Sequence, residues 1–496
     1  MSQKNLTKRT VSSSLWMIIG KTVQAITQLL VITVLARILN PNDFGVVTAA
    51  LVVINFSIIF SSLGVGPALI QKANLRSDQI SAGFILSLTT GMIITVIIYN
   101  CSDIIAEFFD IKELSNVLKI LSLTFLIQGF YIPSLSLLER ELRFKSISLV
   151  NVMAYTVGYG AFSLVLALQG YGVYSLVIGQ IVQEVIKFVS IIFLKRVKFN
   201  LNLTLDSFTS LMNYGAGMTI ANIFNFIAVQ GDNFVVGKML GASSLGIYGR
   251  IYQLMSLPAN LFGQVVDKVL FSSMSKVQSD QIKMRYGYEK ALSLIAFFIL
   301  PLSVFCYINS ETIVLILLGD KWISAVIPFQ LFTIGMFFRI SYKISETIAR
   351  ATGAVYRRAW RQSIYALLVI VGSIIGQNWG INGVIIAVNI ALIANFLLMA
   401  QLSLSILNIN WSNFFKIHMC SLNSSLMLLI VLSIFNYSGN NILIDISVNF
   451  LSFVLLYIFL LTIYPKIFLG QSDWIFNLMK KHIKKIPLKK LQIKAK

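Results

Sequence analysis

Charged residues are scarce in this sequence. Only 12% of its 496 residues are charged, whereas 57% are hydrophobic, and the mean hydropathy is +0.81. Soluble proteins carry about 25% charged residues, because a surface in contact with water needs them. The scarcity excludes a water-soluble enzyme and predicts an integral membrane protein.

Acidic residues are scarcer than basic residues. The chain has 19 Asp and Glu against 40 Lys and Arg, which gives a formal net charge of +21. Such an excess indicates a nucleic acid or an anionic membrane as partner. The hydrophobic composition favours the membrane, so membrane lipids are the expected partner and nucleic acid is not.

Metal-binding and nucleotide-binding motifs are missing. The three cysteines, Cys101, Cys306 and Cys420, lie far apart, and the only histidines are His418 and His482. These residues form neither a metal-ligand cluster nor a disulfide framework. No Gly-x-x-x-x-Gly-Lys-[Ser/Thr] sequence occurs, so the chain has no ATP site of its own. We expect no metal, no cofactor and no catalytic residue.

Long apolar runs are abundant. A helix that crosses a bilayer needs about 20 mostly apolar residues, and helices satisfy their backbone hydrogen bonds within the lipid. The predicted fold is therefore an all-α integral membrane protein with about fourteen transmembrane helices. The predicted spans are 12–38, 44–69, 80–100, 114–137, 146–168, 171–194, 208–240, 245–271, 288–308, 322–345, 356–376, 381–404, 417–435 and 442–464.

Basic residues lie on one side of these spans. With the N-terminus in the cytoplasm, the inside segments hold clusters such as Arg140, Arg143 and Lys145. The opposite side is nearly bare of basic residues, and its longest predicted loop, 102–113, is acidic. The positive-inside rule therefore predicts that both termini are cytoplasmic. The basic tail, 466–496, lies on the membrane surface or in solvent.

An internal repeat connects the two halves of the chain. At an offset of 201 residues, the segment 34–40 matches 235–241, and Phe44-Gly45 then matches Leu245-Gly246. Each copy ends one span, makes a turn and begins the next, so the pattern predicts two parallel six-helix lobes with pseudo-two-fold symmetry. The predicted boundaries are 1–200 and 201–405 for the lobes, 406–465 for a C-terminal helix pair, and 466–496 for the tail. Chance similarity between apolar segments is the alternative.

Polar residues recur at the same depth of each lobe's first helix. Lys21, Gln24 and Gln28 share one face of the first span. At the repeat offset, Lys21 matches Asn222 and Gln24 matches Asn225. If the lobes face each other, these residues line one central cavity. The alternative is that they are satisfied between the helices of a single lobe.

Other ionisable residues also fall within spans, where they usually face a wet cavity or a partner. The basic ones are Lys187, Arg250, Arg339 and Lys343, and the acidic ones are Glu184, Asp232 and Asp267. Bases outnumber acids, so the predicted cavity is cationic and attracts an anion such as phosphate. Glu184 with Lys187 could instead form a structural ion pair. Glu184 and Asp232 are the candidates for ion coupling.

Two stretches resemble a known family. Residues 35–45, Leu-Ala-Arg-Ile-Leu-Asn-Pro-Asn-Asp-Phe-Gly, resemble the first turn of Wzx-type polysaccharide flippases. Residues 232–241 and the following Leu245-Gly246-Ile247-Tyr248 resemble the same proteins. These flippases belong to the multidrug/oligosaccharidyl-lipid/polysaccharide exporter superfamily, and the colanic-acid-exporter branch is the most similar.

This resemblance implies an alternating-access transporter in a bacterial cytoplasmic membrane. The implied substrate is an oligosaccharide on undecaprenyl pyrophosphate, which moves to the periplasmic leaflet for exopolysaccharide, capsule or O-antigen synthesis. Lys21, Lys187, Arg250 and Arg339 are candidates for the cationic lumen typical of the family. Polysaccharide polymerase and assembly proteins are possible partners.

Two alternatives belong to other functional classes. A drug or cation antiporter of the same superfamily needs carboxylates in its cavity, whereas bases dominate here. A membrane polysaccharide polymerase or ligase needs a substantial outer loop with catalytic groups, and no predicted outer loop is long. We therefore favour the flippase over both the antiporter and an enzyme.

Overall fold

The computed structural model is helical. It describes residues 3–61, 65–72, 75–197, 204–278, 280–435, 437, 439 and 441–463. No β-strand occurs among these residues, and many of the helices are long and apolar enough to span a membrane. The prediction of an all-α membrane protein is therefore confirmed. The predicted basic tail, 466–496, lies outside the described residues.

Eleven segments of the described residues could cross a bilayer by length and composition. One of them, Tyr356–Leu407, contains both α13 (Val355–Gly376) and α14 (Gly380–Leu407). Outside these segments, α9 (Leu205–Lys276) is a 72-residue helix that is broken at Gly241. The exact count of fourteen spans stays a prediction.

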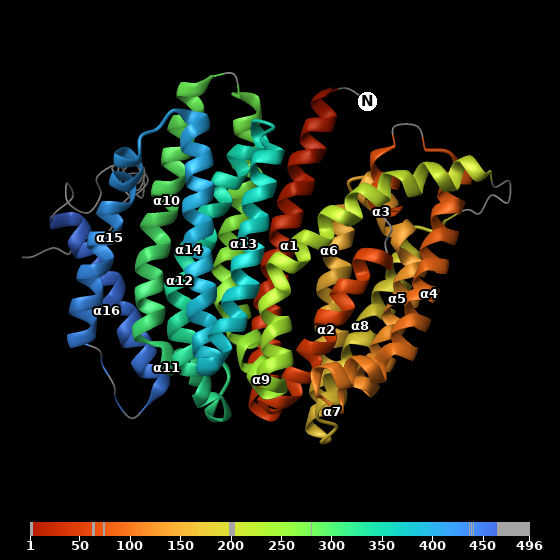
Figure 1. Ribbon diagram of the computed structural model, residues 1–496, viewed down its shortest axis with the longest axis horizontal. Helices are drawn as coiled ribbons and strands as arrows, with labels where there is room; N and C mark the ends of the chain where they lie inside the picture. Colours follow the sequence, from red (N-terminus) through yellow and green to blue (C-terminus); the bar gives the residue numbers. More distant parts are fainter. Residues whose placement is uncertain are drawn as a thin grey trace, which may run out of the picture. The chain divides into compact units, whose positions relative to one another are not determined.

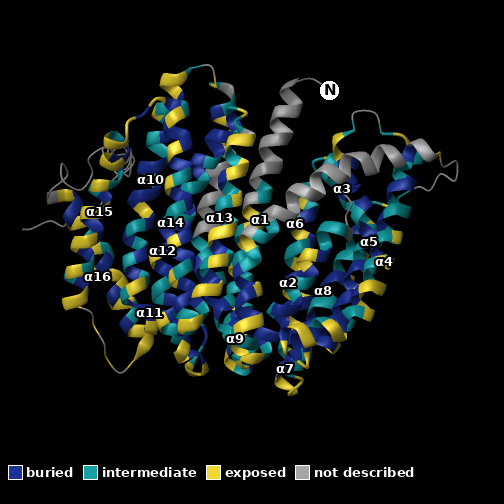
Figure 2. Ribbon diagram, in the orientation of Figure 1, coloured by how far each residue is buried: buried dark blue, intermediate teal, exposed yellow. Residues whose placement is uncertain are grey.

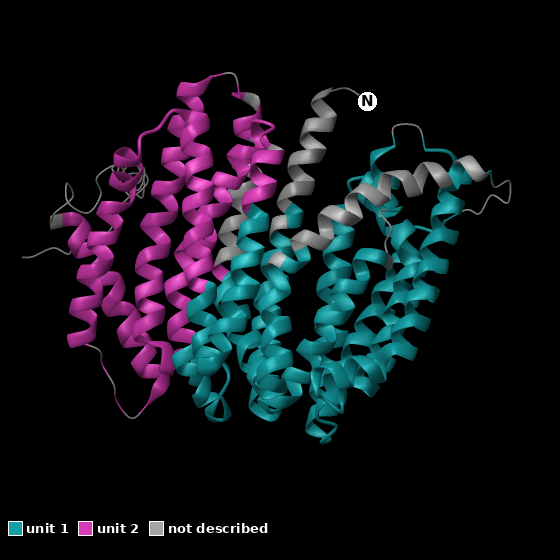
Figure 3. Ribbon diagram, in the orientation of Figure 1, with its two compact units in different colours: residues 1–257, 314–328, 362–388 teal, residues 258–313, 329–361, 389–496 magenta. Residues whose placement is uncertain are grey.

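The chain forms two compact units (Figure 3). Unit 1 comprises Met1–Leu257, Val314–Pro328 and Gln362–Val388. Unit 2 comprises Pro258–Ile313, Phe329–Arg361 and Asn389–Lys496. Helices α9, α13 and α14 are therefore among those that contribute to both units. The lobe boundaries predicted from the repeat stay a prediction.

Unit 1 contains the N-terminal helices (Figure 1). They are α1 (Gln3–Ile38), α2 (Pro41–Ser61), α3 (Val65–Gln71), α4 (Ser77–Phe109), α5 (Leu114–Arg140), α6 (Phe144–Met153), the π-helix η1 (Ala154–Phe162), α7 (Ser163–Leu168) and α8 (Val173–Leu194). Unit 1 also holds residues 205–257 of α9, the end of α11 (Ser310–Leu317), the short helix η2 (Asp320–Ala325), the start of α12 (Val326–Ala351), the end of α13, η3 (Gln377–Trp379) and the start of α14.

Helix α4 is longer than the sequence predicts. It packs along α5 and runs to Phe109, so most of the expected acidic loop at 102–113 is helical. The reason lies in α5, where Lys119 Nζ is 3.1 Å from the Asp103 carboxylate and the Ser115 hydroxyl also donates to it. These partners on α5 stabilise a carboxylate that would otherwise favour a loop.

Unit 2 is built around α10 (Gln281–Ile308), α12 (Val326–Ala351), α15 (Trp411–Ile434) and α16 (Ile442–Ile463). Asp280 is the N-cap residue of helix α10. Its side chain accepts a hydrogen bond from the Lys283 backbone N–H at 3.1 Å. The hydrogen bond from the Lys283 ammonium lowers the pKa of Asp280 below its usual value. An apolar cluster that includes Phe305, Leu428 and Phe453 joins α10, α15 and α16.

Exposed residues are found along the described helices of both units (Figure 2), and many of them are large and apolar. Examples are Ile93 and Val96 on α4, which are 56% and 54% exposed, and Leu451 and Leu455 on α16. So many exposed large apolar side chains are unfavourable in water and indicate contact with another apolar phase. The exposed surface therefore agrees with a multi-pass membrane protein.

Candidate functional site

The two repeat motifs meet in unit 1, where the start of α2 contacts the second part of α9, which follows the break at Gly241. A side chain at Gly45 would place its Cβ 1.7 Å from the Ala242 carbonyl oxygen. A side chain at Gly246 would place its Cβ 1.9 Å from the Pro41 carbonyl oxygen. Both distances are far below van der Waals contact, so only glycine permits this backbone approach.

Aromatic packing holds this crossing together. The ring of Phe44 lies edge-on to Trp322, with 5.5 Å between the ring centroids, and both side chains are fully buried. Trp322 Nε1 donates a 2.9 Å hydrogen bond to the Ala36 carbonyl oxygen. Arg37, the basic residue of the first motif, donates to the Ile316 carbonyl oxygen at 2.9 Å. Arg37 therefore has a structural contact at the turn.

Arg250 lies one helical turn after Gly246, against the same crossing. Its guanidinium carbon is 4.7 Å from the centroid of the Phe44 ring, and Nη1 donates to Gln253 Oε1 at 2.8 Å. The residue is only 9% exposed. The glycine contact thus places a cationic side chain in the interior of unit 1.

Arg250 has no carboxylate partner among the described residues, and its Nε–H donates to no described group. Its other neighbours are neutral: Tyr155 and Tyr159 lie near enough to interact with it electrostatically. These two rings stack at 5.2 Å on η1, and π-helical segments are frequent at functional sites. Because an uncompensated buried charge is costly, this arrangement fits an anionic group such as phosphate.

Glu184 is the centre of a different buried cluster. Lys187 Nζ lies 2.7 Å from its carboxylate, and the Tyr131 hydroxyl donates to it at 2.8 Å. The Glu184 side chain is 3% exposed and that of Lys187 is 19% exposed. The charge of Lys187 is therefore compensated within unit 1, in contrast to that of Arg250.

Asp232 is buried near the end of the first part of α9. It accepts a 2.6 Å hydrogen bond from the Tyr248 hydroxyl, which lies beyond the break at Gly241. The side-chain amide of the adjacent Asn233 donates to Gln230 Oε1 at 2.9 Å. Asp232 therefore links the two parts of α9 across the break.

The predicted polar face of α1 is only partly enclosed. Lys21 is exposed, whereas Gln24 and Gln28 are half-buried. Asn222 and Asn225 lie on α9, but their side chains lie outside the described residues. The central cavity predicted from these residues stays a prediction.

Arg339 is half-buried on α12 and belongs to unit 2.

The structure groups Arg250 with Phe44, Tyr155, Tyr159 and Gln253. The sequence indicated none of these four neighbours as site residues. The four-residue spacing of the two tyrosines in a predicted span was the one available signal.

A family model described as "Polysaccharide biosynthesis protein" matches residues 34–327, more than half of the chain. The chain belongs to this polysaccharide biosynthesis protein family. The resemblance drawn from the two motifs is thereby confirmed, and both motifs lie within the matched residues.

Relatives of this family member are 22–24% identical to it. The lipopolysaccharide biosynthesis protein WzxC of Escherichia coli K12 is 24% identical over 400 residues, which cover 79% of this chain and 80% of WzxC. The teichuronic acid biosynthesis protein TuaB of Bacillus subtilis is 23% identical over 402 residues, which cover 75% of this chain and 82% of TuaB.

Solved structures share the fold of this family member. The lipid II flippase MurJ, in an inward closed conformation, has a TM-score of 0.77 at 19% identity, and the match covers 93% of this chain and 100% of MurJ. An inward-facing multidrug transporter of the MATE family has a TM-score of 0.60 at 15% identity, covering 77% of this chain and 95% of the transporter.

Proposed function

We propose that this protein is a flippase for a lipid-linked oligosaccharide. It moves an oligosaccharide on undecaprenyl pyrophosphate from the cytoplasmic to the periplasmic leaflet of a bacterial cytoplasmic membrane, by alternating access. Membership of the polysaccharide biosynthesis family supports this, as do the names of WzxC, TuaB and the structural neighbour MurJ. The product serves synthesis of a surface polysaccharide.

The buried guanidinium of Arg250 is the observation that carries this proposal. A pyrophosphate headgroup cannot enter hydrocarbon alone, because each unpaired polar group costs several kcal/mol there. Arg250 offers a preformed cation with a free Nε–H among the described residues and neutral aromatic neighbours. When a phosphate binds, its negative charge and the positive charge of the Arg250 guanidinium would compensate each other.

The other predicted residues take supporting roles in this proposal. Lys21, Gln24 and Gln28 present an accessible polar face on α1 for phosphate or sugar hydroxyls. Lys187, Arg339, Asn222 and Asn225 stay proposed substrate contacts, and Lys187 has the weakest support because Glu184 compensates its charge. Ion coupling through Glu184 or Asp232 is likewise proposed.

The topology belongs to the same proposal. The distribution of Lys and Arg supports cytoplasmic termini. The protein translocates its substrate without changing a covalent bond, so it is a transporter and not an enzyme. The polymerase and assembly proteins that consume the flipped product are its proposed partners. An antiporter for cations has less support, since Glu184 is paired with Lys187.

The test measures flipping in proteoliposomes that contain an undecaprenyl-pyrophosphate oligosaccharide. Its sugar is probed from outside with a membrane-impermeant oxidant. We expect Arg250→Gln to slow flipping roughly tenfold to a hundredfold, because a hydrogen bond to a charged group is lost. Arg250→Lys, which keeps the charge, should retain an intermediate rate.

Lys112→Gln is the matched control, since Lys112 is exposed in the connection between α4 and α5. It removes the same charge and should flip at the parental rate. Size-exclusion profiles show whether each variant is folded. A folded Arg250→Gln variant with the parental rate would contradict the role of Arg250. Absence of flipping by the parental protein would contradict the function itself.

A further inference from the structure

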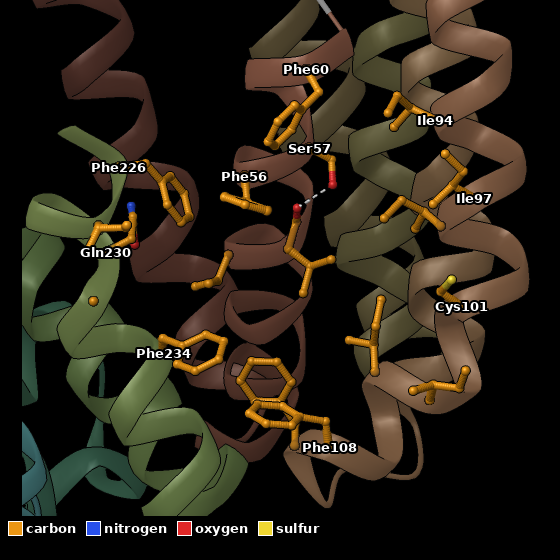
Figure 4. Close-up of a pocket in the computed structure, with 18 of the residues that line it drawn as sticks. Phe56, Ser57, Phe60, Ile94, Ile97, Cys101, Phe108, Phe226, Gln230 and Phe234 are labelled. Atoms are coloured by element: carbon orange, nitrogen blue, oxygen red, sulfur yellow. Dashed lines mark hydrogen bonds between the residues drawn. The ribbon is translucent and has the colours of Figure 1, made fainter. Parts of the chain in front are cut away.

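Unit 1 contains an apolar cavity of about 850 Å³ between α2, α4 and α9 (Figure 4). Nearly all of its lining is aliphatic or aromatic, and Ser57 and Gln230 are among the few polar residues there. The Ser57 hydroxyl donates to the Val53 carbonyl oxygen at 2.9 Å, so its proton already has an acceptor within α2. Such a lining offers water few hydrogen-bonding partners and suits an apolar ligand.

Aromatic rings mark the two ends of the cavity. At one end, the centroid of Phe56 lies 5.2 Å from that of Phe60 and 5.3 Å from that of Phe226. At the other end, the Phe108 and Phe234 centroids are 5.4 Å apart. The cavity therefore extends along the helices, as Figure 4 shows.

Its length is sufficient for a chain that crosses one leaflet. Ile94 and Phe108 on α4 both line the cavity, and their separation along a helix is about 21 Å. One leaflet contributes about 15 Å of hydrocarbon to the bilayer. The cavity thus accommodates a chain that reaches from a membrane surface to about the midplane.

The cavity is accessible from the lipid. The lining residues Ile97, Ile104 and Phe108 are 47%, 68% and 44% exposed. They are apolar and lie on a helix that is long and apolar enough to cross a membrane, so we place them against the hydrocarbon of the bilayer. A lipid chain can therefore enter sideways, without crossing a polar barrier.

A lysine lies at the Phe108 end. Lys238 Nζ is 4.9 Å from the centroid of the Phe108 ring, and the residue is exposed in the last turn before Gly241. Among the described residues, no carboxylate pairs with Lys238, while Asp103 on α4 is occupied by Lys119. The apolar cavity is thus accompanied by a cation at membrane-surface depth.

We propose that this cavity binds a phospholipid, with one acyl chain between α4 and α9 and the phosphate at Lys238. An acyl chain spans one leaflet and so fits within the length of the cavity, whereas the polyprenyl chain of a carrier lipid is much longer than one leaflet. Basic side chains beside transmembrane helices are known to select lipid phosphates. This site is separate from Arg250 and does not rest on the proposed transport function.

The experiment measures phosphatidylglycerol retained by the purified full-length protein, by native mass spectrometry after reconstitution in phosphatidylglycerol vesicles. Ile97→Trp fills the cavity and should abolish retention of one lipid. Ile93→Trp is its matched control, because Ile93 is 56% exposed on the same helix and does not line the cavity. Lys238→Gln should weaken retention about fivefold, whereas Lys112→Gln should not.

Each outcome decides the proposal. Loss of one lipid in Ile97→Trp but not in Ile93→Trp, together with weaker retention in Lys238→Gln, supports it. Unchanged retention in a folded Ile97→Trp variant overturns it, as does equal retention in Lys238→Gln and Lys112→Gln. Displacement of phosphatidylglycerol by an equimolar polyprenyl phosphate also overturns it, since the carrier lipid would then be the occupant.

Discussion

Two glycines determine what surrounds Arg250. Gly45 and Gly246 allow the backbones of α2 and α9 to touch, and this contact brings Phe44 under the guanidinium of Arg250. A methyl group at either position would overlap a carbonyl oxygen of the other helix. The position of the Arg250 guanidinium therefore depends on two glycines, which carry no functional group themselves.

Gly246→Ala tests this dependence. We expect the free energy of unfolding of the variant to fall by roughly 1–3 kcal/mol, because backbone atoms must move to make room for the methyl group. The measurement is the melting temperature in detergent, followed by size-exclusion chromatography. Gly66→Ala is the control, since the nearest atoms there belong to side chains at 3.1 and 3.8 Å. Equal melting temperatures for the two variants would show that the helices can separate without cost.

At the scale of elements, the break in α9 is the decisive feature. Gly241 has φ 78° and ψ 178°, a region that essentially only glycine occupies. The break divides α9 into two parts that carry Asp232 and Arg250 respectively, and the Tyr248–Asp232 hydrogen bond joins them again. The sequence predicted a turn at this place from the repeat, and the structure shows its backbone form.

We expect Gly241→Ala to destabilise the protein by roughly 1–3 kcal/mol. No atom lies within 4 Å of the position of a new Cβ, so the cost comes from the backbone conformation and not from a clash. Thermal unfolding in detergent measures it, and Tyr248→Phe reports separately on the hydrogen bond to Asp232. A Gly241→Ala variant as stable as the parent would mean that the break adopts another conformation without penalty.

At the scale of the whole molecule, the transport proposal requires a water-filled path. In a background with serine at Cys101, Cys306 and Cys420, we expect Gln24→Cys and Asn225→Cys to react with a water-soluble maleimide. Ile93→Cys should be protected, because Ile93 is an exposed apolar residue on a membrane-spanning helix. Labelling is measured by mass shift. Complete protection at both Gln24 and Asn225 would remove the case for a shared cavity.

Sequence reasoning predicted the helices well and the site only partly. Spans are long contiguous apolar runs, so α5 and α8 lie close to their predicted ranges. Arg250 was predicted because a charge in such a run is conspicuous. Its neighbours Phe44 and Tyr155 were not, since aromatic residues in spans are ordinary and these lie far from Arg250 along the chain. The apolar cavity of unit 1 had no sequence signal for the same reason.

The sequence by itself determined that this is a helical membrane protein with two turn motifs typical of its family. Hydropathy and motif spacing are local properties of neighbouring residues, so the unfolded chain already carries them. The sequence left open whether Glu184 pairs with Lys187, three residues further along the same helix. Only the tertiary structure decided that Tyr131 of α5 also donates to Glu184 and that no described carboxylate compensates Arg250. The state of a buried charge depends on which distant segments pack against it, and that is fixed only when the helices assemble.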